Sequence, residues 1–161
     1  MTAQTLRDLL PTASGRTIVV RSDLNCPLDE GTVTDDGRIR ASLPVITQLA
    51  EAGAKVIVMA HLGRPNGTVT PEFSLAPVAK RMRELTDIPV TLADDITGPD
   101  AQQRAQQLEP RQILLLQNVR FDARETSKND AERTELAQEI AALAGDHAAY
   151  VYDAFGAVHR K

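Results

Sequence analysis

Short apolar runs alternate with longer amphipathic segments along this 161-residue chain. The second run, residues 55–60, is apolar almost throughout, which indicates a strand that is buried on both faces. Strands of that kind belong to parallel sheets whose faces are covered by helices. We therefore predict five strands, at residues 17–22, 55–60, 89–92, 113–116 and 148–152.

Between these runs, apolar residues recur at spacings of three and four, which is the pattern of an amphipathic helix. Residues 38–52 show this pattern most clearly, and Gly53 is suited to end that helix. Ser74 and Asn129 are typical N-cap residues, and Glu132 forms a capping-box pattern with Asn129. We predict helices at residues 38–52, 75–85, 100–108 and 129–143, with a short helical turn at residues 6–10.

This order of elements predicts an α/β fold, a Rossmann-like three-layer α/β/α domain with a mostly parallel sheet. The length suits one domain with a substantial core, and no linker rich in Pro, Gly or Ser divides the chain. Pro27 and Gly31 place a loop after the first strand.

The composition is that of a globular protein, with 42% hydrophobic and 25% charged residues. No stretch approaches the ~20 consecutive apolar residues of a membrane span, and no signal-peptide pattern is visible. Cys26 is the only cysteine, so no internal disulfide can form. The 3% aromatic content and the absence of a basic stripe argue against nucleic acid. We therefore expect a cytoplasmic protein that binds neither membranes nor nucleic acid.

Basic and polar residues follow four of the predicted strands, although the chain as a whole has a net charge of -4. The carboxyl ends of parallel strands lie at one edge of a sheet, where ligands bind. An acidic protein with a cationic edge is suited to a small anion. The segments concerned are residues 21–25, 61–65, 118–121 and 153–160.

Arginine is the main cation of these segments, and its planar guanidinium group matches phosphate and carboxylate. Taken singly, each arginine has a structural explanation. Arg64 could lie in a surface turn with Gly63, and Arg120 or Arg160 could form a salt bridge with a neighbour. Gathered at one edge, they would repel one another unless they shared an anion.

Arg38 lies in the first turn of the predicted helix, where backbone N–H groups and the helix dipole already favour negative charge. An arginine at this position suggests that an anion binds nearby. The alternative is an exposed ion pair with Asp35 or Asp36.

Asp23 and Asn25 follow the first strand and are expected to alternate in direction with Leu24. A carboxylate and an amide at this position could bind the hydroxyl groups of a ligand. The alternatives are ordinary turn chemistry, or an ion pair that holds Asp23 to Arg21.

Other chemistry has weaker support. His61, His147 and His159 lack the spacing of metal ligands, and Cys26 has no evident activating base. Asp94 and Asp95 resemble a pair of metal ligands, but we expect them to lie in a solvated loop at the start of a helix. No glycine-rich dinucleotide motif or P-loop is present, so we expect side chains to bind the anion.

Five segments together resemble motifs of the phosphoglycerate kinase family, and they occur in the same order and at the same spacing as in that family. The resemblance covers residues 6–161 and is identified from Arg21-Ser22-Asp23-Leu24-Asn25-Cys26-Pro27, Gly37-Arg38-Ile39, Ala60-His61-Leu62-Gly63-Arg64-Pro65, Gln117-Asn118-Val119-Arg120-Phe121 and Asp153-Ala154-Phe155-Gly156-Ala157-Val158-His159-Arg160. It implies that residues 1–161 are a truncated N-terminal substrate-binding domain and that the C-terminal nucleotide domain is absent.

The resemblance also implies site roles. Arg64, Arg120 and Arg160 are expected to hold the 3-phosphate of 3-phosphoglycerate or 1,3-bisphosphoglycerate. Asp23 and Asn25 are expected to hold the C2 hydroxyl group and adjacent oxygens. The segment His61-Leu62-Gly63 is expected to contact the same substrate. Arg38 is expected to contact the carboxyl or acyl-phosphate end of the substrate and, as the catalytic residue, to stabilise the phosphoryl group during transfer.

The implied reaction is reversible phosphoryl transfer between 1,3-bisphosphoglycerate and ADP in glycolysis, catalysed by a monomeric enzyme. Mg-ATP or Mg-ADP would bind to the C-terminal domain, so the chain alone is expected to bind phosphoglycerate without catalysing transfer. Gln117 stands where the family usually has Glu, which removes one negative charge. Two alternatives remain: a stand-alone binding module for a small phosphorylated anion, and an interaction domain that keeps the fold without using the site.

Overall fold

A computed structural model describes residues 10–63, 65, 67–145 and 148–153 of the chain. Its main sheet contains five strands in the order β5-β6-β4-β1-β7, and every neighbouring pair is parallel. The parallel sheet predicted from the buried apolar runs is confirmed. The strands are β1 (Thr17–Ser22), β4 (Lys55–Met59), β5 (Val90–Leu92), β6 (Gln112–Leu115) and β7 (Ala149–Asp153).

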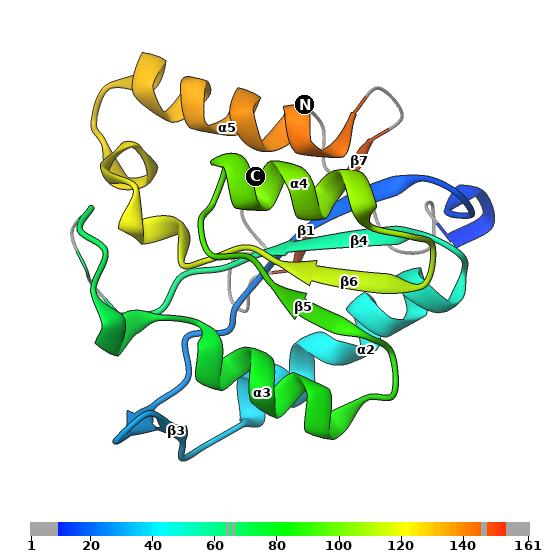
Figure 1. The fold of residues 1–161 in the computed structure, drawn as a ribbon, viewed down its shortest axis with the longest axis horizontal. Coiled ribbons are helices and arrows are strands. Elements are labelled where there is room, and N and C mark those ends of the chain that lie inside the picture. The colour runs from blue at the N-terminus through cyan, green and yellow to red at the C-terminus, as the bar shows by residue number, and fades with distance from the viewer. Residues whose placement is uncertain (1–9, 64, 66, 146–147, 154–161) are drawn as a thin grey trace.

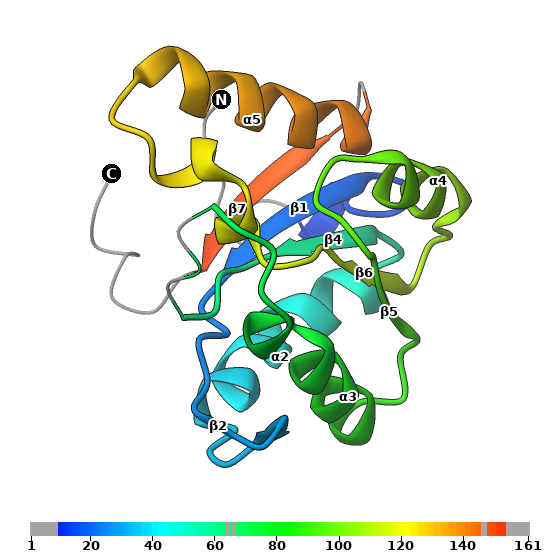
Figure 2. The same cartoon turned by 60° about the vertical axis from the view of Figure 1, so that its left-hand side comes forward.

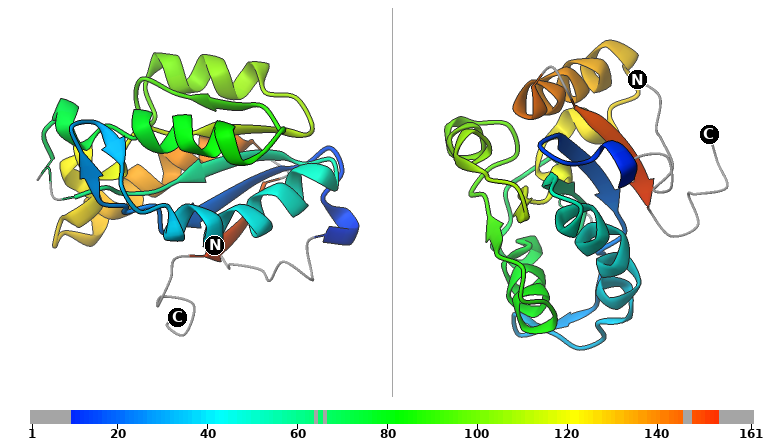
Figure 3. Two further views of the ribbon diagram at one scale, coloured as in Figure 1. Left: turned by 90° about the horizontal axis from the view of Figure 1, so that it is seen from below. Right: turned by 90° about the vertical axis from the view of Figure 1, so that its right-hand side faces the viewer.

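Helices cover both faces of this sheet and complete the predicted three-layer α/β/α arrangement (Figure 1). One face carries α2 (Gly37–Glu51) and α3 (Ala76–Leu85), and the other carries α4 (Pro99–Gln107) and α5 (Asp130–Ala144). Figure 3 shows the same layers from below and from one end. Within the described ranges, no helix is long and apolar enough to cross a membrane.

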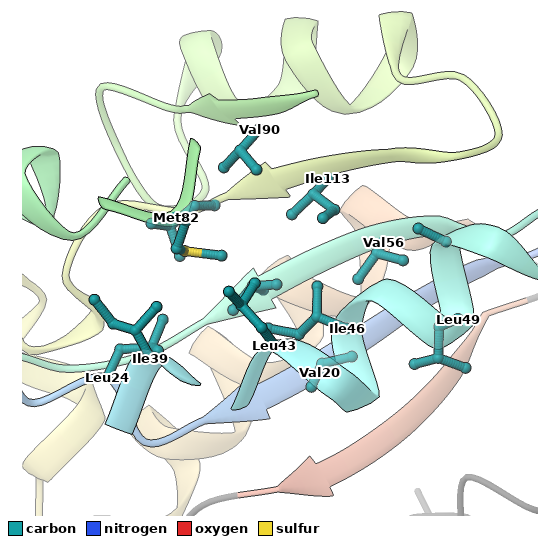
Figure 4. Packing of buried hydrophobic residues seen from close by; sticks show 14 of the residues in the cluster. Val20, Leu24, Ile39, Leu43, Ile46, Leu49, Val56, Met82, Val90 and Ile113 are labelled. Atoms are coloured by element: carbon teal, nitrogen blue, oxygen red, sulfur yellow. The ribbon is translucent and has the colours of Figure 1, made fainter. Parts of the chain in front are cut away.

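The strand period divides the core into two clusters. Ile18 and Val20 point to the side of α2 and α3, whereas Val19 between them belongs to the cluster beneath α4 and α5. Figure 4 shows the first cluster, where Leu43 and Ile46 of α2 pack against the sheet. Because both faces are buried, the central strands have no polar side, as the sequence pattern predicted.

A small hairpin is an element that the sequence analysis missed. Strands β2 (Leu28–Asp29) and β3 (Thr32–Val33) pair antiparallel where only a loop was expected. Two residues connect them, and both have positive φ, 51° at Glu30 and 78° at Gly31. This is the type I′ geometry of a tight hairpin, normally signalled by Asn-Gly or Asp-Gly. Glutamate at the first position concealed the turn.

Two helix starts differ in detail from their predicted caps. Ser74 Oγ accepts a hydrogen bond from Ala76 N (3.1 Å), but α3 begins two residues after Ser74. Asn129 caps α5 through Ala131 N (2.9 Å), as predicted. In a capping box Glu132 would accept a hydrogen bond directly from Asn129 N. Here Ser127 lies between them: its Oγ accepts from Asn129 N and donates to the Glu132 carboxylate. Of the predicted turn at residues 6–10, residues 6–9 lie outside the described residues.

Three loops gather at the carboxyl edge of the sheet because β6, β4 and β1 are neighbours in it. In Figure 1 the strands end on the left, where the segments after β1, β4 and β6 come together, and Figure 2 shows the same edge turned forward. These are three of the four segments in which the sequence placed cations.

Candidate functional site

The loop after β1 is held by the first turn of α2. Asp23 Oδ1 accepts hydrogen bonds from Asn25 N (3.2 Å) and from Arg38 Nη1 (3.3 Å), and Arg38 Nη1 also donates to Asn25 O (2.8 Å). Strand β1 ends at Ser22, so Asp23 and Asn25 lie in an Asx-type turn. The expected alternation is nevertheless present in their burial, since Leu24 is fully buried whereas Asp23 and Asn25 are partly exposed.

Arg38 faces this edge, as its place in the sequence suggested. Its ionic partner is Asp23, 15 residues away along the chain, and neither Asp35 nor Asp36. Asp36 is instead occupied by Arg40 and Arg81. The Arg38 side chain remains 48% exposed, so two contacts through Nη1 orient a guanidinium group that solvent can still reach.

The loop after β4 connects to the first loop through Asn25. Asn25 Oδ1 accepts a hydrogen bond from Gly63 N at 3.0 Å. The side chain of Leu62 is buried in the core, and its carbonyl accepts from Asn118, so Leu62 could contact a ligand only through its backbone N–H. Arg64, the cation expected in this loop, lies outside the described residues.

Asn118 is a residue whose role the sequence analysis did not identify. It follows β6, is completely buried, and joins three segments. Its Nδ2 donates to Leu62 O (2.7 Å) and Phe73 O (2.9 Å), and its Oδ1 accepts from Arg120 N (3.0 Å). A fully buried amide needs such partners, and here they fix two loops of the edge relative to each other.

Gln117 has a similar structural task. Its Oε1 accepts from Leu75 N (2.8 Å) and Asn118 N (3.0 Å), and its Nε2 donates to Ser74 Oγ (3.1 Å). The side chain is buried and connects the end of β6 to the start of α3. A neutral amide can both donate and accept at this position without the cost of a buried charge.

Gly63 is required by the close packing of its loop. Its φ is +63°, and a Cβ at this position would lie 2.4 Å from Cε1 of Phe73. We expect Gly63→Ala to lower the free energy of unfolding by about 2 kcal/mol, because backbone strain and displacement of the Phe73 ring add together. Urea denaturation measures this change.

Gly15→Ala is the matched control for Gly63→Ala. Gly15 has a similar φ of +76°, but nothing lies within 4 Å of its added Cβ. It should show the backbone cost alone, about 1 kcal/mol. Equal losses in the two variants would show that contact with Phe73 does not constrain the loop.

Arg120 and Arg21 share one carboxylate. Glu125 Oε1 lies 3.4 Å from Arg21 Nη2 and 3.6 Å from Arg120 Nε. The alternative in which Arg21 holds Asp23 was wrong, since Arg21 pairs with Glu125, which lies 104 residues away in sequence. Glu125 thus supplies, from within the chain, the shared anion that gathered arginines need.

His61 lies beside the same group of charges. Burial, and then the positive charges of Arg120 and Arg21, lower the pKa of the His61 ring, while Asp23 and Glu125 oppose this shift. The histidine is therefore neutral at neutral pH and can accept a proton or a hydrogen bond. It is a half-buried neighbour of the arginines and not a fully enclosed core residue.

The short helix that carries Glu125 is anchored on its other side by Arg124. Arg124 Nη1 and Nη2 bind both Glu139 oxygens, at 2.7 and 2.8 Å, and the guanidinium group also binds Asp122 and Glu135. These contacts fasten residues Ala123–Thr126 to α5. Thr97 Oγ1 adds a hydrogen bond to Glu139 at 2.7 Å.

This network gives the chain a specific sensitivity to acid. Hydrogen bonds from Arg124, and then from Thr97, lower the pKa of Glu139 to about 2. Since this folded-state pKa is below the unfolded value of about 4.3, the carboxylate stabilises the fold above about pH 5, and this contribution disappears as the pH falls towards 2. Glu139→Gln should therefore be less stable than wild type at pH 7, with the difference vanishing near pH 2, in urea denaturation at several pH values.

Glu51→Gln is the control for Glu139→Gln, because Glu51 is exposed and forms no ion pair within the described part of the chain. It should leave the acid dependence of stability unchanged. A difference between Glu139→Gln and wild type that stayed constant from pH 7 to pH 2 would contradict the assignment.

Cys26, considered as a nucleophile, and Asp95, considered as a metal ligand, both have structural roles. Burial raises the pKa of the Cys26 thiol to about 11, so it is protonated and unreactive, as expected of a buried cysteine. Asp95 accepts from Ala101 N (2.8 Å) and Asp100 N (3.2 Å) and thus caps α4. In the part of the chain that the structure describes, no three His, Cys, Asp or Glu side chains cluster as metal ligands.

The structure thus brings together five of the sequence-predicted side chains and the Gly63 backbone, while Arg64 and Arg160 lie outside the described residues. Glu125 and Asn118 are the additions that only the structure reveals. We call the described group the cationic rim: Arg21, Asp23, Asn25, Arg38, His61, Gly63, Arg120 and Glu125.

Comparisons with known proteins point to one family. The family model "Phosphoglycerate kinase" matches residues 6–161. Proteins named phosphoglycerate kinase from Corynebacterium jeikeium and Paenarthrobacter aurescens are each 57% identical over 162 residues, covering 100% of this chain but 40% of their own lengths. This chain therefore spans about two fifths of the relatives that it matches.

Solved structures agree with this result. The phosphoglycerate kinase of Coxiella burnetii matches with a TM-score of 0.70 and 36% identity, over 92% of this chain and 35% of that protein. The enzyme of the same name from Pyrococcus horikoshii OT3 matches with a TM-score of 0.77 and 31% identity, over 91% and 36%.

Proposed function

The chain belongs to the phosphoglycerate kinase family, and from this premise we propose that its cationic rim binds phosphoglycerate. The observation that carries the proposal is the convergence of Arg38 from the first turn of α2, His61 from the loop after β4 and Arg120 from the segment after β6. Three arginines of the rim face two carboxylates, which leaves one net positive charge on a chain whose total is -4. A small phosphorylated anion suits that local excess.

Arg120 is proposed to bind the 3-phosphate together with Arg64 and Arg160. Its guanidinium group is partly exposed at the edge of the sheet, and its backbone is held through Asn118. A planar cation held in this way can form two parallel hydrogen bonds to phosphate. Asp23 and Asn25 are proposed to bind the C2 hydroxyl group and adjacent oxygens, with His61 next to them and the Gly63 backbone beside Asn25.

Arg38 is proposed to act on the phosphoryl group during transfer. Phosphoryl transfer depends on positioning and on stabilisation of charge spread over the equatorial oxygens. Arg38 is held through one guanidinium nitrogen, Nη1, by Asp23 and Asn25, yet its side chain is half exposed to incoming ligand. Such a cation needs little rearrangement when charge develops beside it.

The complete activity is proposed to be reversible transfer between 1,3-bisphosphoglycerate and ADP, yielding 3-phosphoglycerate and ATP in glycolysis. Mg-ADP or Mg-ATP is proposed to bind to the part of the family's length that this chain does not span. The enzyme is proposed to be monomeric and cytoplasmic. Support comes from the family assignment and from a rim whose described groups suit the phosphoglycerate half of the reaction.

The test is a titration of the complete gene product that carries this chain with 3-phosphoglycerate, followed by NMR of the His61 ring. We expect the His61 signals to shift and to saturate, because a phosphate at Arg120 would change the charge beside the ring. Glycerate, which lacks the phosphate, should bind at least about tenfold more weakly. No change in the His61 signals at millimolar 3-phosphoglycerate would contradict the proposal and favour an interaction domain.

A further inference from the structure

Glu125 lies inside the cationic rim, although nothing in the proposed reaction requires a carboxylate there. Its side chain is only 16% exposed, and its Oε1 forms ion pairs with both Arg21 and Arg120. A partly buried carboxylate placed between two cations of an anion site competes with the ligand for the same charges.

The contacts of Glu125 balance charge without completing the hydrogen bonding of Arg120. At 3.6 Å, the distance from Glu125 Oε1 to Arg120 Nε is too long for a hydrogen bond. Arg120 Nε is buried and has no hydrogen-bond partner among the described residues. A buried N–H group without an acceptor costs free energy, so a ligand oxygen that accepted from Arg120 Nε would be favoured, and Glu125 does not supply that acceptor.

The position of Glu125 is set by its neighbour. Arg124 binds Asp122, Glu135 and Glu139, so the turn that carries Glu125 is fixed to α5 on the far side from the rim. Because its backbone is anchored there, Glu125 is restricted in how far it can withdraw when another anion arrives. Its charge then stays near the bound ligand and opposes it.

We propose that Glu125 is an internal counter-anion of the cationic rim and that the phosphate group of the ligand replaces it as the main partner of Arg120. This inference rests on the proposed function and adds a residue that sets affinity and specificity. A phosphate dianion carries more charge than one carboxylate and can supply the acceptor that Arg120 Nε lacks. A ligand that carries only a carboxylate has the same charge as Glu125 and therefore gains no electrostatic advantage by replacing it.

The decisive variant is Glu125→Gln in the complete gene product. The substitution keeps the size of the side chain and an Oε1 acceptor but removes the charge that competes with phosphate. We expect the dissociation constant for 3-phosphoglycerate to fall about fivefold at low salt, with a smaller effect at high salt because screening weakens the competition. Isothermal titration calorimetry measures both values.

Three companion measurements separate competition from a purely structural effect. Glu125→Asp keeps the charge and should leave the affinity near the wild-type value, and the exposed Glu51→Gln should do the same. In the ligand-free protein, Glu125→Gln should lower the pKa of the His61 ring further, because Arg120, Arg21 and Asp23 remain beside it while one opposing negative charge is lost. NMR titration of the ring measures that shift.

Inorganic phosphate is titrated in parallel, because its binding tests competition at Arg120 without requiring recognition of phosphoglycerate. Tighter phosphate binding by Glu125→Gln, with no binding of 3-phosphoglycerate by either protein, would reject the proposed function but support the counter-anion. Unchanged or weaker binding of phosphate and 3-phosphoglycerate by a folded Glu125→Gln would overturn the inference, since Glu125 would then only orient Arg120. Failure of wild type and variant to bind either anion would overturn it too.

Discussion

Replacing Asn118 with alanine is expected to lower the free energy of unfolding by about 3 kcal/mol. The amide is completely buried and satisfies two carbonyl oxygens, of Leu62 and Phe73, and the backbone N–H of Arg120. Each buried group left without a partner costs about 1–3 kcal/mol, and partial relaxation or entry of water recovers some of that sum. Urea denaturation of Asn118→Ala and wild type measures the difference.

The same substitution should weaken 3-phosphoglycerate binding at least about tenfold, because the loops after β4 and β6 lose the side chain that holds them in register. Asn129→Ala is the control: this asparagine caps α5 through one exposed hydrogen bond, and its loss should cost only about 1 kcal/mol. A loss below 1 kcal/mol for Asn118→Ala, with unchanged ligand affinity, would show that the loops are positioned by other contacts.

The sequence predicted the sheet well because the signal was local. A strand buried on both faces must be apolar throughout, and Ile113, Leu114 and Leu115 of β6 carry that information within a few residues. The hairpin at Glu30 and Gly31 was missed because it lacks such a local signal: nothing in the nearby sequence indicates a positive φ at a glutamate. Where tertiary contacts determine the backbone conformation, local sequence patterns do not predict it.

The site was predictable in its residue types but not in its pairing. The carboxyl edge of a parallel sheet identified the segments that contain Asp23, His61 and Arg120, and Arg38 was identified from its place in the first turn of a helix. Which carboxylate each arginine would meet depends on how loops cross the edge, and Arg21 meets Glu125 across 104 positions of sequence. Asn118 did offer a signal, a polar residue shortly after an apolar strand, but only its burial shows that it is structural.

Arg38→Ala is expected to lower kcat by about 100-fold or more in the complete gene product, while the KM for phosphoglycerate changes only a few-fold. A cation that acts on the group in flight contributes mainly in the transition state, so its loss appears in turnover more than in substrate binding. The fold should be little affected, because Arg38 is half exposed and its ion pair with Asp23 is a surface contact. Steady-state kinetics of both reaction directions give kcat and KM.

Arg40→Ala separates this role from a general loss of positive charge. Arg40 lies in the same helix, two residues away, and is 59% exposed in an ion pair with Asp36. Its removal changes the net charge by the same amount, so kcat should stay within about twofold of wild type if location decides the effect. A rise in KM with unchanged kcat for Arg38→Ala would place Arg38 in ground-state binding instead. That result would leave the rim as a binding surface and move the stabilisation of the transferred phosphoryl group to another residue.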